Sequence, residues 1–166
     1  GNEKTVPNCD IELSHVTFAY NREDVIKDVS CKIPQGSVTA LVGPSGSGKS
    51  TISKLIARFW DVNSGSVKIG GKDVRDYTLE SLMEQISMVF QNVYLFADTI
   101  ENNIKFGRPE ATHAEVVAAA KRACCDDFIE ALPDGYNTVI GEGGASLSGG
   151  EKQRLSIARA MLKDAP

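Results

Sequence analysis

Eight residues from Gly43 to Ser50 have the types and the spacing needed to bind phosphate groups. The run Gly43-Pro44-Ser45-Gly46-Ser47-Gly48-Lys49-Ser50, here called the phosphate loop, fits the pattern G-x-x-x-x-G-K-[ST] and is followed by Thr51. Glycines let backbone N–H groups converge on phosphate oxygens, and the next helix directs its positive end to the same place. Lys49 supplies a cation for the β- and γ-phosphates, and the Ser50 hydroxyl suits Mg²⁺. These residues predict a nucleoside triphosphate site.

The elements expected around the phosphate loop agree with that use. Val38 to Val42 is a short apolar run, as expected of a strand buried on both faces, and residues 49–59 show helical spacing of apolar residues. Residues 86–90 are predicted as a further strand. Over residues 10–20 the apolar alternation changes phase, which predicts a bulge or bend. A strand, a glycine loop and a helix in this order favour phosphate binding over a glycine-rich turn with a solvated lysine.

A second glycine motif lies nearer the C-terminus, in Leu147-Ser148-Gly149-Gly150-Glu151-Lys152-Gln153. Ser148, Gly149 and Gly150 present a hydroxyl and bare backbone amides at the start of a helix expected from Glu151 to about Lys163. Such a helix end can bind an anion. Taken alone, the motif would be interpreted as an ordinary glycine-rich helix start.

Together, the two motifs closely resemble those of ABC-type ATPases, and the resemblance runs from about residue 10 to the end of the chain. It implies an α/β fold of the P-loop NTPase class, with an antiparallel β subdomain, an α/β nucleotide-binding core and a helical subdomain. The expected division is a linker or tag remnant over 1–9, β subdomain and core over 10–91, helical subdomain over 92–150, and over 151–166 the signature helix returning to the core.

The resemblance also implies roles for single residues. Tyr20 matches the aromatic residue that stacks on adenine, the alternative being a core aromatic that closes a strand. Gln91 matches the glutamine that contacts Mg²⁺ or the attacking water and also the transmembrane partner, the alternative being a polar residue leaving a strand. Lys49 and Gln91 are the implied catalytic residues, and Ser50 and Gln91 the implied metal ligands. The implied nucleotide-binding residues are Tyr20, Gly43, Pro44, Ser45, Gly46, Ser47, Gly48, Lys49, Ser50, Thr51, Gln91, Ser148, Gly149, Gly150 and Glu151.

Two further segments resemble exporter-type members of the family. Residues 138–144 resemble the loop before the signature, which in exporters contacts the coupling helices of the transmembrane domains; for Glu142, an exposed surface acid is the alternative. Residues 98–104 also look exporter-like. The resemblance therefore implies the ATP-binding domain of an ABC exporter on the cytoplasmic face of a membrane. Its ligands would be ATP and Mg²⁺, and its partners a second nucleotide-binding domain, paired head to tail, and the transmembrane domains.

The sequence departs from the family pattern at its end. It stops at Pro166. In the family, the next strand, called Walker B, carries a Mg²⁺-binding aspartate and the glutamate that activates water, so the resemblance implies that this chain lacks the C-terminal part of the core. Neither His15 nor His113 matches the family's switch histidine. We therefore expect the parent protein to be an active ATPase and the 166-residue chain to bind ATP with negligible hydrolysis. Loss of that strand should also leave core surface uncovered.

Composition disfavours several other function classes. The net charge is −4 and no basic stripe is present, which argues against nucleic acid as a partner. The cysteines at positions 9, 31, 124 and 125 lack metal-ligand spacing. A soluble ABC-type ATPase not tied to transport remains the alternative to an exporter. An unrelated P-loop kinase or GTPase is disfavoured by the second glycine motif and by the lack of a guanine-reading N-K-x-D motif.

Overall fold

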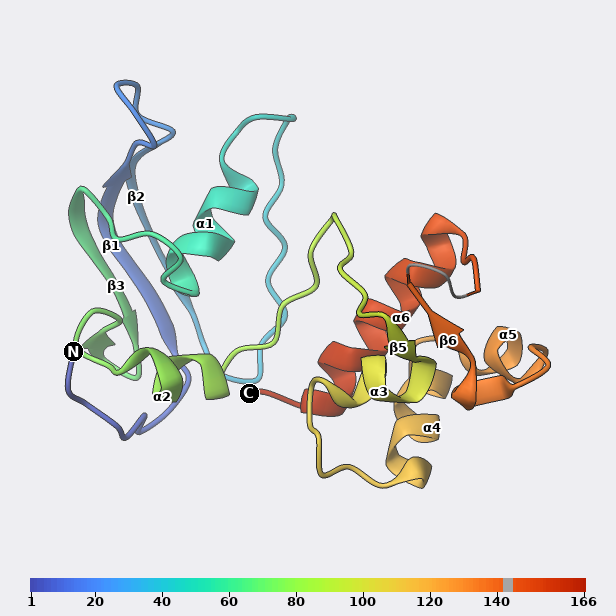
Figure 1. The fold of residues 1–166 in the computed structure, drawn as a ribbon. Coiled ribbons are helices and arrows are strands. Elements are labelled where there is room, and N and C mark those ends of the chain that lie inside the picture. Colours follow the sequence, from blue (N-terminus) through green and yellow to red (C-terminus); the bar gives the residue numbers. More distant parts are fainter. Residues whose placement is uncertain (142–144) are drawn as a thin grey trace. The chain divides into compact units, whose positions relative to one another are not determined.

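The computed structural model describes residues 1–141 and 145–166, which form two compact units. The first unit comprises Gly1–Ile86 together with Pro166, and the second comprises Ser87–Ala165. An antiparallel sheet is the centre of the first unit, whereas the second is mostly helical (Figure 1). The antiparallel β part and the helical part that the sequence predicts are therefore both present.

The first unit contains a four-stranded antiparallel sheet with the order β2-β1-β3-β4. Helix α1 packs on it, because Leu55 of α1 lies in the same buried cluster as Leu13 of β1 and Val67 of β3. Burying apolar side chains between a helix and a sheet is the main stabilising contribution in a unit of this kind. The elements of this unit are β1 (Ile11–Phe18), β2 (Ile26–Ile33), α1 (Lys49–Ile56), β3 (Ser64–Ile69), β4 (Lys72–Asp73) and α2 (Leu79–Glu84).

Strand β1 bends where its apolar alternation changes phase. Its register against β2 shifts between Leu13 and Val16 and again between Val16 and Phe18. His15, inside the first shift, has a φ of +48°. The bulge predicted from the sequence over residues 10–20 is therefore confirmed, since it allows apolar residues of both phases to reach the same core.

Gly65 of β3 approaches this bend so closely that a side chain has no room. Its φ is +79°, and a Cβ would lie 2.2 Å from the carbonyl oxygen of His15 and 2.4 Å from that of Ser14. We expect Gly65→Ala to lower the free energy of unfolding by more than about 2 kcal/mol, because the backbone of β1 or β3 must move. Urea denaturation measures this loss.

The matched control for this prediction is Gly71→Ala. Gly71 has a similar φ of +81°, but a Cβ there would meet no atom within 4 Å. The control therefore reports the cost of the left-handed backbone conformation without the steric clash. Equal losses of stability in the two variants would show that the close approach of Gly65 to β1 costs nothing.

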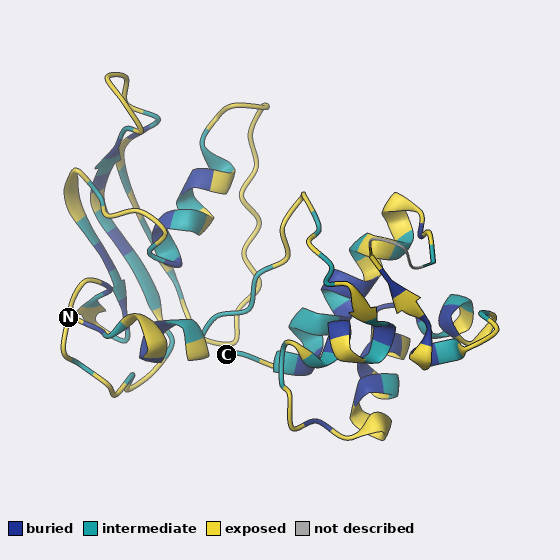
Figure 2. Ribbon diagram, viewed as in Figure 1, coloured by how far each residue is buried: buried dark blue, intermediate teal, exposed yellow. Residues whose placement is uncertain are grey.

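Residues 37–47 lead into α1 and pair with no strand among the described residues. Figure 2 shows this segment exposed along its length, and Val38 and Val42 are 101% and 93% exposed. The strand predicted over Val38 to Val42 is thus not formed, and residues 86–90, also predicted as a strand, form none either. A buried parallel strand needs neighbouring strands for its backbone hydrogen bonds, and the described residues provide none beside residues 38–42.

The second unit is built around the long helix α6 (Gly149–Lys163). Leu155, Ala158 and Leu162 of α6 share one buried cluster with apolar residues of α3 and α4, including Ile104 and Val116. Helices in residues 1–141 and 145–166 are too short or too polar to cross a bilayer. The other elements of this unit are β5 (Asp98–Thr99), α3 (Ile100–Lys105), α4 (His113–Arg122), α5 (Asp126–Glu130), the 3-10 helix η1 (Gly135–Asn137) and β6 (Val139–Ile140), which pairs with β5.

The division between the units differs from the one expected from the sequence. It falls between Ile86 and Ser87, so Gln91 belongs to the second unit rather than to the core. Helix α6 also lies wholly in the second unit, because its buried side chains pack on α3 and α4. The signature helix, expected over residues 151–166 to return to the core, is instead the centre of the helical part.

The N-terminal segment, expected to be a linker or tag remnant over residues 1–9, is hydrogen-bonded to the first unit. The backbone N–H of Glu3 donates to the carbonyl of Asp76, and the N–H of Thr78 donates to the carbonyl of Glu3. The Glu3 carboxylate also accepts a hydrogen bond from Lys72 Nζ at 2.6 Å. This segment is therefore hydrogen-bonded, through an isolated β-bridge of Glu3, to the loop before α2.

Candidate functional site

The phosphate loop enters α1 through glycines in the left-handed backbone region. Gly46 has a φ of +79°, and Gly48, the N-cap of α1, has a φ of +93°. Residues with a Cβ rarely adopt this conformation. At Gly48 a Cβ would also lie 2.6 Å from Cδ1 of Ile26 in β2. The left-handed turn therefore favours glycine at position 48, and a Cβ there would also displace the end of the Ile26 side chain.

The first turn of α1 is open to an anion. Gly48 provides no side-chain cap, and the first turn contains no acidic residue. The first backbone N–H groups of a helix lack intrahelical acceptors, and they carry the positive end of the helix dipole. Ser50 is exposed in this turn, where its hydroxyl is a suitable oxygen ligand for Mg²⁺. This helix end therefore fits a phosphate with its metal ion.

Lys49 folds back over the phosphate loop. Its Nζ donates hydrogen bonds of 2.7 Å to the carbonyl oxygens of Gly43 and Pro44, and one of 3.3 Å to Oγ of Ser47. These oxygens hold the ammonium group at the mouth of the loop. Phosphate oxygens are stronger partners for an ammonium than neutral carbonyls are, so the same group suits a triphosphate.

Tyr20 lies beside the start of α1. Its hydroxyl oxygen is 3.1 Å from Oγ1 of Thr51. Its ring meets those of Phe18 and Trp60 almost perpendicularly, with centroid distances of 4.9 and 5.3 Å. The tyrosine is 38% exposed, so part of it stays accessible to a ligand. Tyr20 thus lies close to the phosphate loop, as stacking on adenine requires, and it also makes packing contacts of the kind that the alternative interpretation describes.

The start of α6 is a second helix end preceded by glycine-rich sequence, but it carries its own cap. Oγ of Ser148 accepts a hydrogen bond from the Glu151 N–H at 3.2 Å, and the Glu151 carboxylate accepts one from the Ser148 N–H at 2.8 Å. This capping box starts the helix at Gly149, two residues before the predicted start. The cap uses a lone pair of the Ser148 oxygen, and the Ser148 O–H would have to turn from the Glu151 carboxylate in order to donate to another anion.

Glu151 gives this helix end a negative charge. Hydrogen bonds from the Ser148 backbone and side chain lower the pKa of the Glu151 carboxyl below its ordinary value of 4.5. Glu151 is therefore ionised at neutral pH, and its charge lies next to exposed Ser148, Gly149 and Gly150. The two helix ends differ electrostatically, because α1 has no acidic residue in its first turn.

Gln91 lies exposed at a bend of the second unit. Shortly after it, residues 93–95 line a pocket of about 340 Å³, and residues 145–147 line the same pocket just before Ser148. The segment after Gln91 and the segment before the signature therefore meet at one cavity. Glu142, Gly143 and Gly144 lie outside the described residues.

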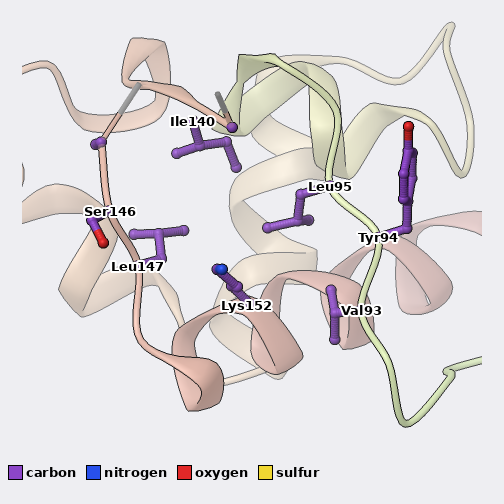
Figure 3. A pocket seen from close by; sticks show the side chains of 9 residues that line it. Val93, Tyr94, Leu95, Ile140, Ser146, Leu147 and Lys152 are labelled. Atoms are coloured by element: carbon purple, nitrogen blue, oxygen red, sulfur yellow. The ribbon is translucent and has the colours of Figure 1, made fainter. Parts of the chain in front are cut away.

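Figure 3 shows how this pocket is built. Leu95 lies on one wall and Leu147 on the other, while Lys152 of α6 lies between them with its side chain among the lining residues. Ile140 of β6 also lines the pocket. The lining is mixed, with apolar walls and one cation.

The structure groups the predicted site residues into two sets. Tyr20, Thr51 and the phosphate loop lie together in the first unit, whereas Gln91 and residues 148–151 lie in the second. Sequence reasoning missed Trp60, Asn103, Lys152 and Arg159 as neighbours of these residues. Asn103 and Arg159 had a recognisable signal, because each is a polar residue on the apolar face of a helix.

Comparisons with known proteins identify the family. The model of the family described as "ABC transporter" matches residues 26–166. An ATP-dependent lipid A-core flippase of Desulfotalea psychrophila is 51% identical over 156 residues, which cover 94% of this chain and 27% of the flippase. A putative multidrug export ATP-binding/permease protein of Bacillus subtilis is 49% identical over 158 residues, covering 94% of this chain and 27% of that protein. The chain thus spans about a quarter of the length of these relatives.

A solved structure agrees with these sequence matches. A bacterial Atm1-family ABC exporter with ATP bound superimposes with a TM-score of 0.91 at 45% identity, over 98% of this chain and 28% of that chain. This likeness confirms the predicted fold class, a P-loop NTPase of the ABC type, and the resemblance to exporter-type proteins. The chain belongs to the ABC transporter family.

Proposed function

We propose that this chain is the ATP-binding domain of an ABC exporter, and that ATP binding and hydrolysis by the intact protein drive export of a substrate across a membrane. One observation carries the proposal: the uncapped N-terminus of α1, preceded by the phosphate loop and bearing Lys49. Relatives named as a lipid A-core flippase and a multidrug export protein favour an exporter over a soluble ABC-type ATPase.

In this proposal the phosphate loop holds the triphosphate. The N–H groups at the start of α1 bind its oxygens, and Lys49 exchanges the carbonyls of Gly43 and Pro44 for the β- and γ-phosphates. Ser50 and Gln91 are the proposed ligands of Mg²⁺, which supplies positive charge to the phosphates when bound. Tyr20 stacks on adenine, since its ring is held beside Thr51 by the hydroxyl contact of 3.1 Å.

The start of α6 serves a second copy of the site. A triphosphate occupies one glycine-rich helix end, yet the described residues contain two, at the starts of α1 and α6. We therefore propose that Ser148 to Gly150 face the phosphate loop of a second nucleotide-binding domain. The Ser148 hydroxyl and the glycine amides then bind the γ-phosphate from the opposite side. In such a head-to-tail pair ATP holds the two domains together, because its phosphates are contacted from both sides.

The transmembrane domains are the second proposed partner. The pocket between residues 93–95 and 145–147 offers apolar walls and a lysine at its floor, which suits a short amphipathic helix end. Its lining includes Ile140 and Gly141, which belong to the segment that resembles the exporter loop. In this proposal the domain lies on the cytoplasmic face of the membrane.

Binding of ATP to this chain should change the fluorescence of Trp60, the one tryptophan in the sequence. Its ring centroid lies 5.3 Å from that of Tyr20, so stacking of adenine on Tyr20 alters its surroundings. We expect Tyr20→Ala to weaken binding about tenfold, because an aromatic contact contributes roughly 0.5–1.5 kcal/mol beyond the buried area. Titration of Trp60 emission with ATP, alongside isothermal titration calorimetry, measures the affinity.

The matched control is Tyr20→Phe, which keeps the ring and loses only the contact with Thr51. Its affinity for ATP should stay within about twofold of the original. Calorimetry that detects no ATP binding at millimolar concentration would contradict the proposed function itself. A Tyr20→Ala variant that binds as well as the original would contradict only the stacking role.

A further inference from the structure

Asn103 of α3 is the centre of a buried polar network in the second unit. Its side chain is almost fully buried, with 1% of the residue exposed. Oδ1 accepts a hydrogen bond of 2.8 Å from the Phe96 N–H, and Nδ2 donates to the carbonyls of Phe96 at 3.1 Å and Thr99 at 2.9 Å. A buried amide without such partners would cost several kcal/mol. Asn103 therefore fastens the chain after Gln91 to α3.

Arg159 of α6 extends this network to the signature helix. Nε donates to the Asn103 carbonyl at 2.8 Å, and Nη1 donates to the Tyr94 carbonyl at 3.0 Å. The guanidinium also lies 5.7 Å from the ring centroids of Phe96 and Phe106. Partial burial of the Arg159 guanidinium lowers its pKa, because the charged form loses contact with water. A rigid, planar fork is needed for these contacts, and lysine cannot reproduce them.

The same helix also holds the chain on the other side of Gln91. Nε2 of Gln153 donates to the Phe90 carbonyl at 3.4 Å. Helix α6 thus binds the backbone before Gln91 through Gln153 and after it through Arg159. Because Ser148 is the N-cap of this helix, the signature end and the Gln91 segment are attached to one rigid element.

We infer that Arg159 and Asn103 are positioning residues that couple the Gln91 segment to α6, so that a shift of the Ser148 end moves Gln91 with it. The inference rests on the proposed function, in which Ser148 and Gln91 serve nucleotide sites. The inference means that when the Ser148 end closes on the nucleotide of a second domain, Gln91 is moved into position for a different nucleotide. Neither residue touches the nucleotide; both act through the backbone of residues 94–99.

Local order of the segment is the first test, measured by amide hydrogen exchange in the intact protein. Arg159→Lys keeps the positive charge but loses the planar guanidinium with its several N–H donors. Amide hydrogen exchange of peptides covering residues 94–98 should therefore accelerate about fivefold or more. The matched control is Arg154→Lys, on the same helix. Arg154 also contacts a carbonyl, that of Cys124 at 3.3 Å, and a ring, that of Phe128 at 5.7 Å, yet neither belongs to the Gln91 segment. Unchanged exchange in Arg159→Lys, or equal acceleration in both variants, would overturn the inference.

Catalysis by the intact protein is the second test, and it separates positioning from general support of the fold. Arg159→Lys should lower kcat about tenfold while the affinity for ATP changes less than about twofold, since the phosphate loop is untouched. Combined with Asn103→Ser, the loss of kcat should be clearly smaller than the product of the single losses, because both act on one network. A kcat that stays normal while local exchange accelerates would mean a structural role only.

A third test uses the unmodified protein, so it can be carried out even if the variants do not fold. When the intact protein is titrated with ATP, exchange of peptides covering residues 90–97 and 148–155 should change with one common midpoint. Separate midpoints would contradict the coupling. If the unmodified protein neither binds nor hydrolyses ATP, the proposed function fails, whereas the exchange comparison of Arg159→Lys with Arg154→Lys still decides whether the network holds the segment.

Discussion

Lys49→Ala should weaken ATP binding by about 10- to 100-fold, because a charge-assisted hydrogen bond contributes roughly 1.5–3 kcal/mol. In the intact protein the same substitution should remove ATP hydrolysis, since the charge that develops on the phosphates loses its nearest cation. Fold stability should change little, because Lys49 Nζ contacts only the carbonyls of Gly43 and Pro44 and the hydroxyl of Ser47 among the described residues. Calorimetry and phosphate release measure the two effects.

Lys54→Ala is the matched control, because Lys54 lies in the last turn of the same helix, away from the phosphate loop. It should bind ATP as the original chain does. Because both variants lose one positive charge, the comparison shows whether the position of the charge matters or only the net charge. Equal weakening in both variants would mean that the nucleotide is attracted by general electrostatics. If Lys49→Ala binds ATP as tightly as the original chain, the phosphate loop is not part of the ATP site.

Gly149→Asp should abolish ATP-dependent pairing of nucleotide-binding domains while leaving ATP bound to the phosphate loop. A Cβ at Gly149 would meet no atom within 4 Å, so the fold tolerates a side chain there. The added carboxylate lies beside ionised Glu151 at the place proposed for a γ-phosphate. Like charges in such an interface cost several kcal/mol, which corresponds to more than about a 100-fold loss of pairing.

The measurement is the distance between spin labels on two domains of the intact protein, with and without ATP, together with ATP affinity. Gly149→Ala is the control, since it adds the Cβ without the charge and should still close on ATP. If Gly149→Asp closes normally, Ser148 to Gly150 do not face a nucleotide. If it loses ATP affinity in the open state, the two glycine motifs do not act on separate molecules.

The parts of the site that the sequence predicted are those set by neighbours in the chain. The phosphate loop and the helix start at the second glycine motif depend on residues that are close together in the chain, so their spacing alone indicates them. The bulge of β1 was also predictable, because a change in apolar phase is visible in one strand. The start of α6 was displaced only from Glu151 to Gly149.

The parts that were missed depend on contacts between distant residues. An apolar run such as Val38 to Val42 becomes a strand only when other strands lie beside it. The residues of the run do not indicate whether such neighbours are present. Arg159 binds the carbonyl of Tyr94 and the backbone of Asn103, partners far away in the chain. A polar residue on an apolar helix face signals that a partner exists, but it does not identify the partner.

The contrast between the two helix ends sets an order of events. The end of α1 is uncapped and without acid, so it gains a full set of hydrogen bonds from the first triphosphate that arrives. At the end of α6 the N–H groups of Ser148 and Glu151 are already hydrogen-bonded within the capping box, and an anion there meets a carboxylate. A nucleotide therefore loads at α1 first, and α6 joins only when a γ-phosphate is presented to it already held in place. The difference in capping thus determines which of the two helix ends binds the nucleotide first.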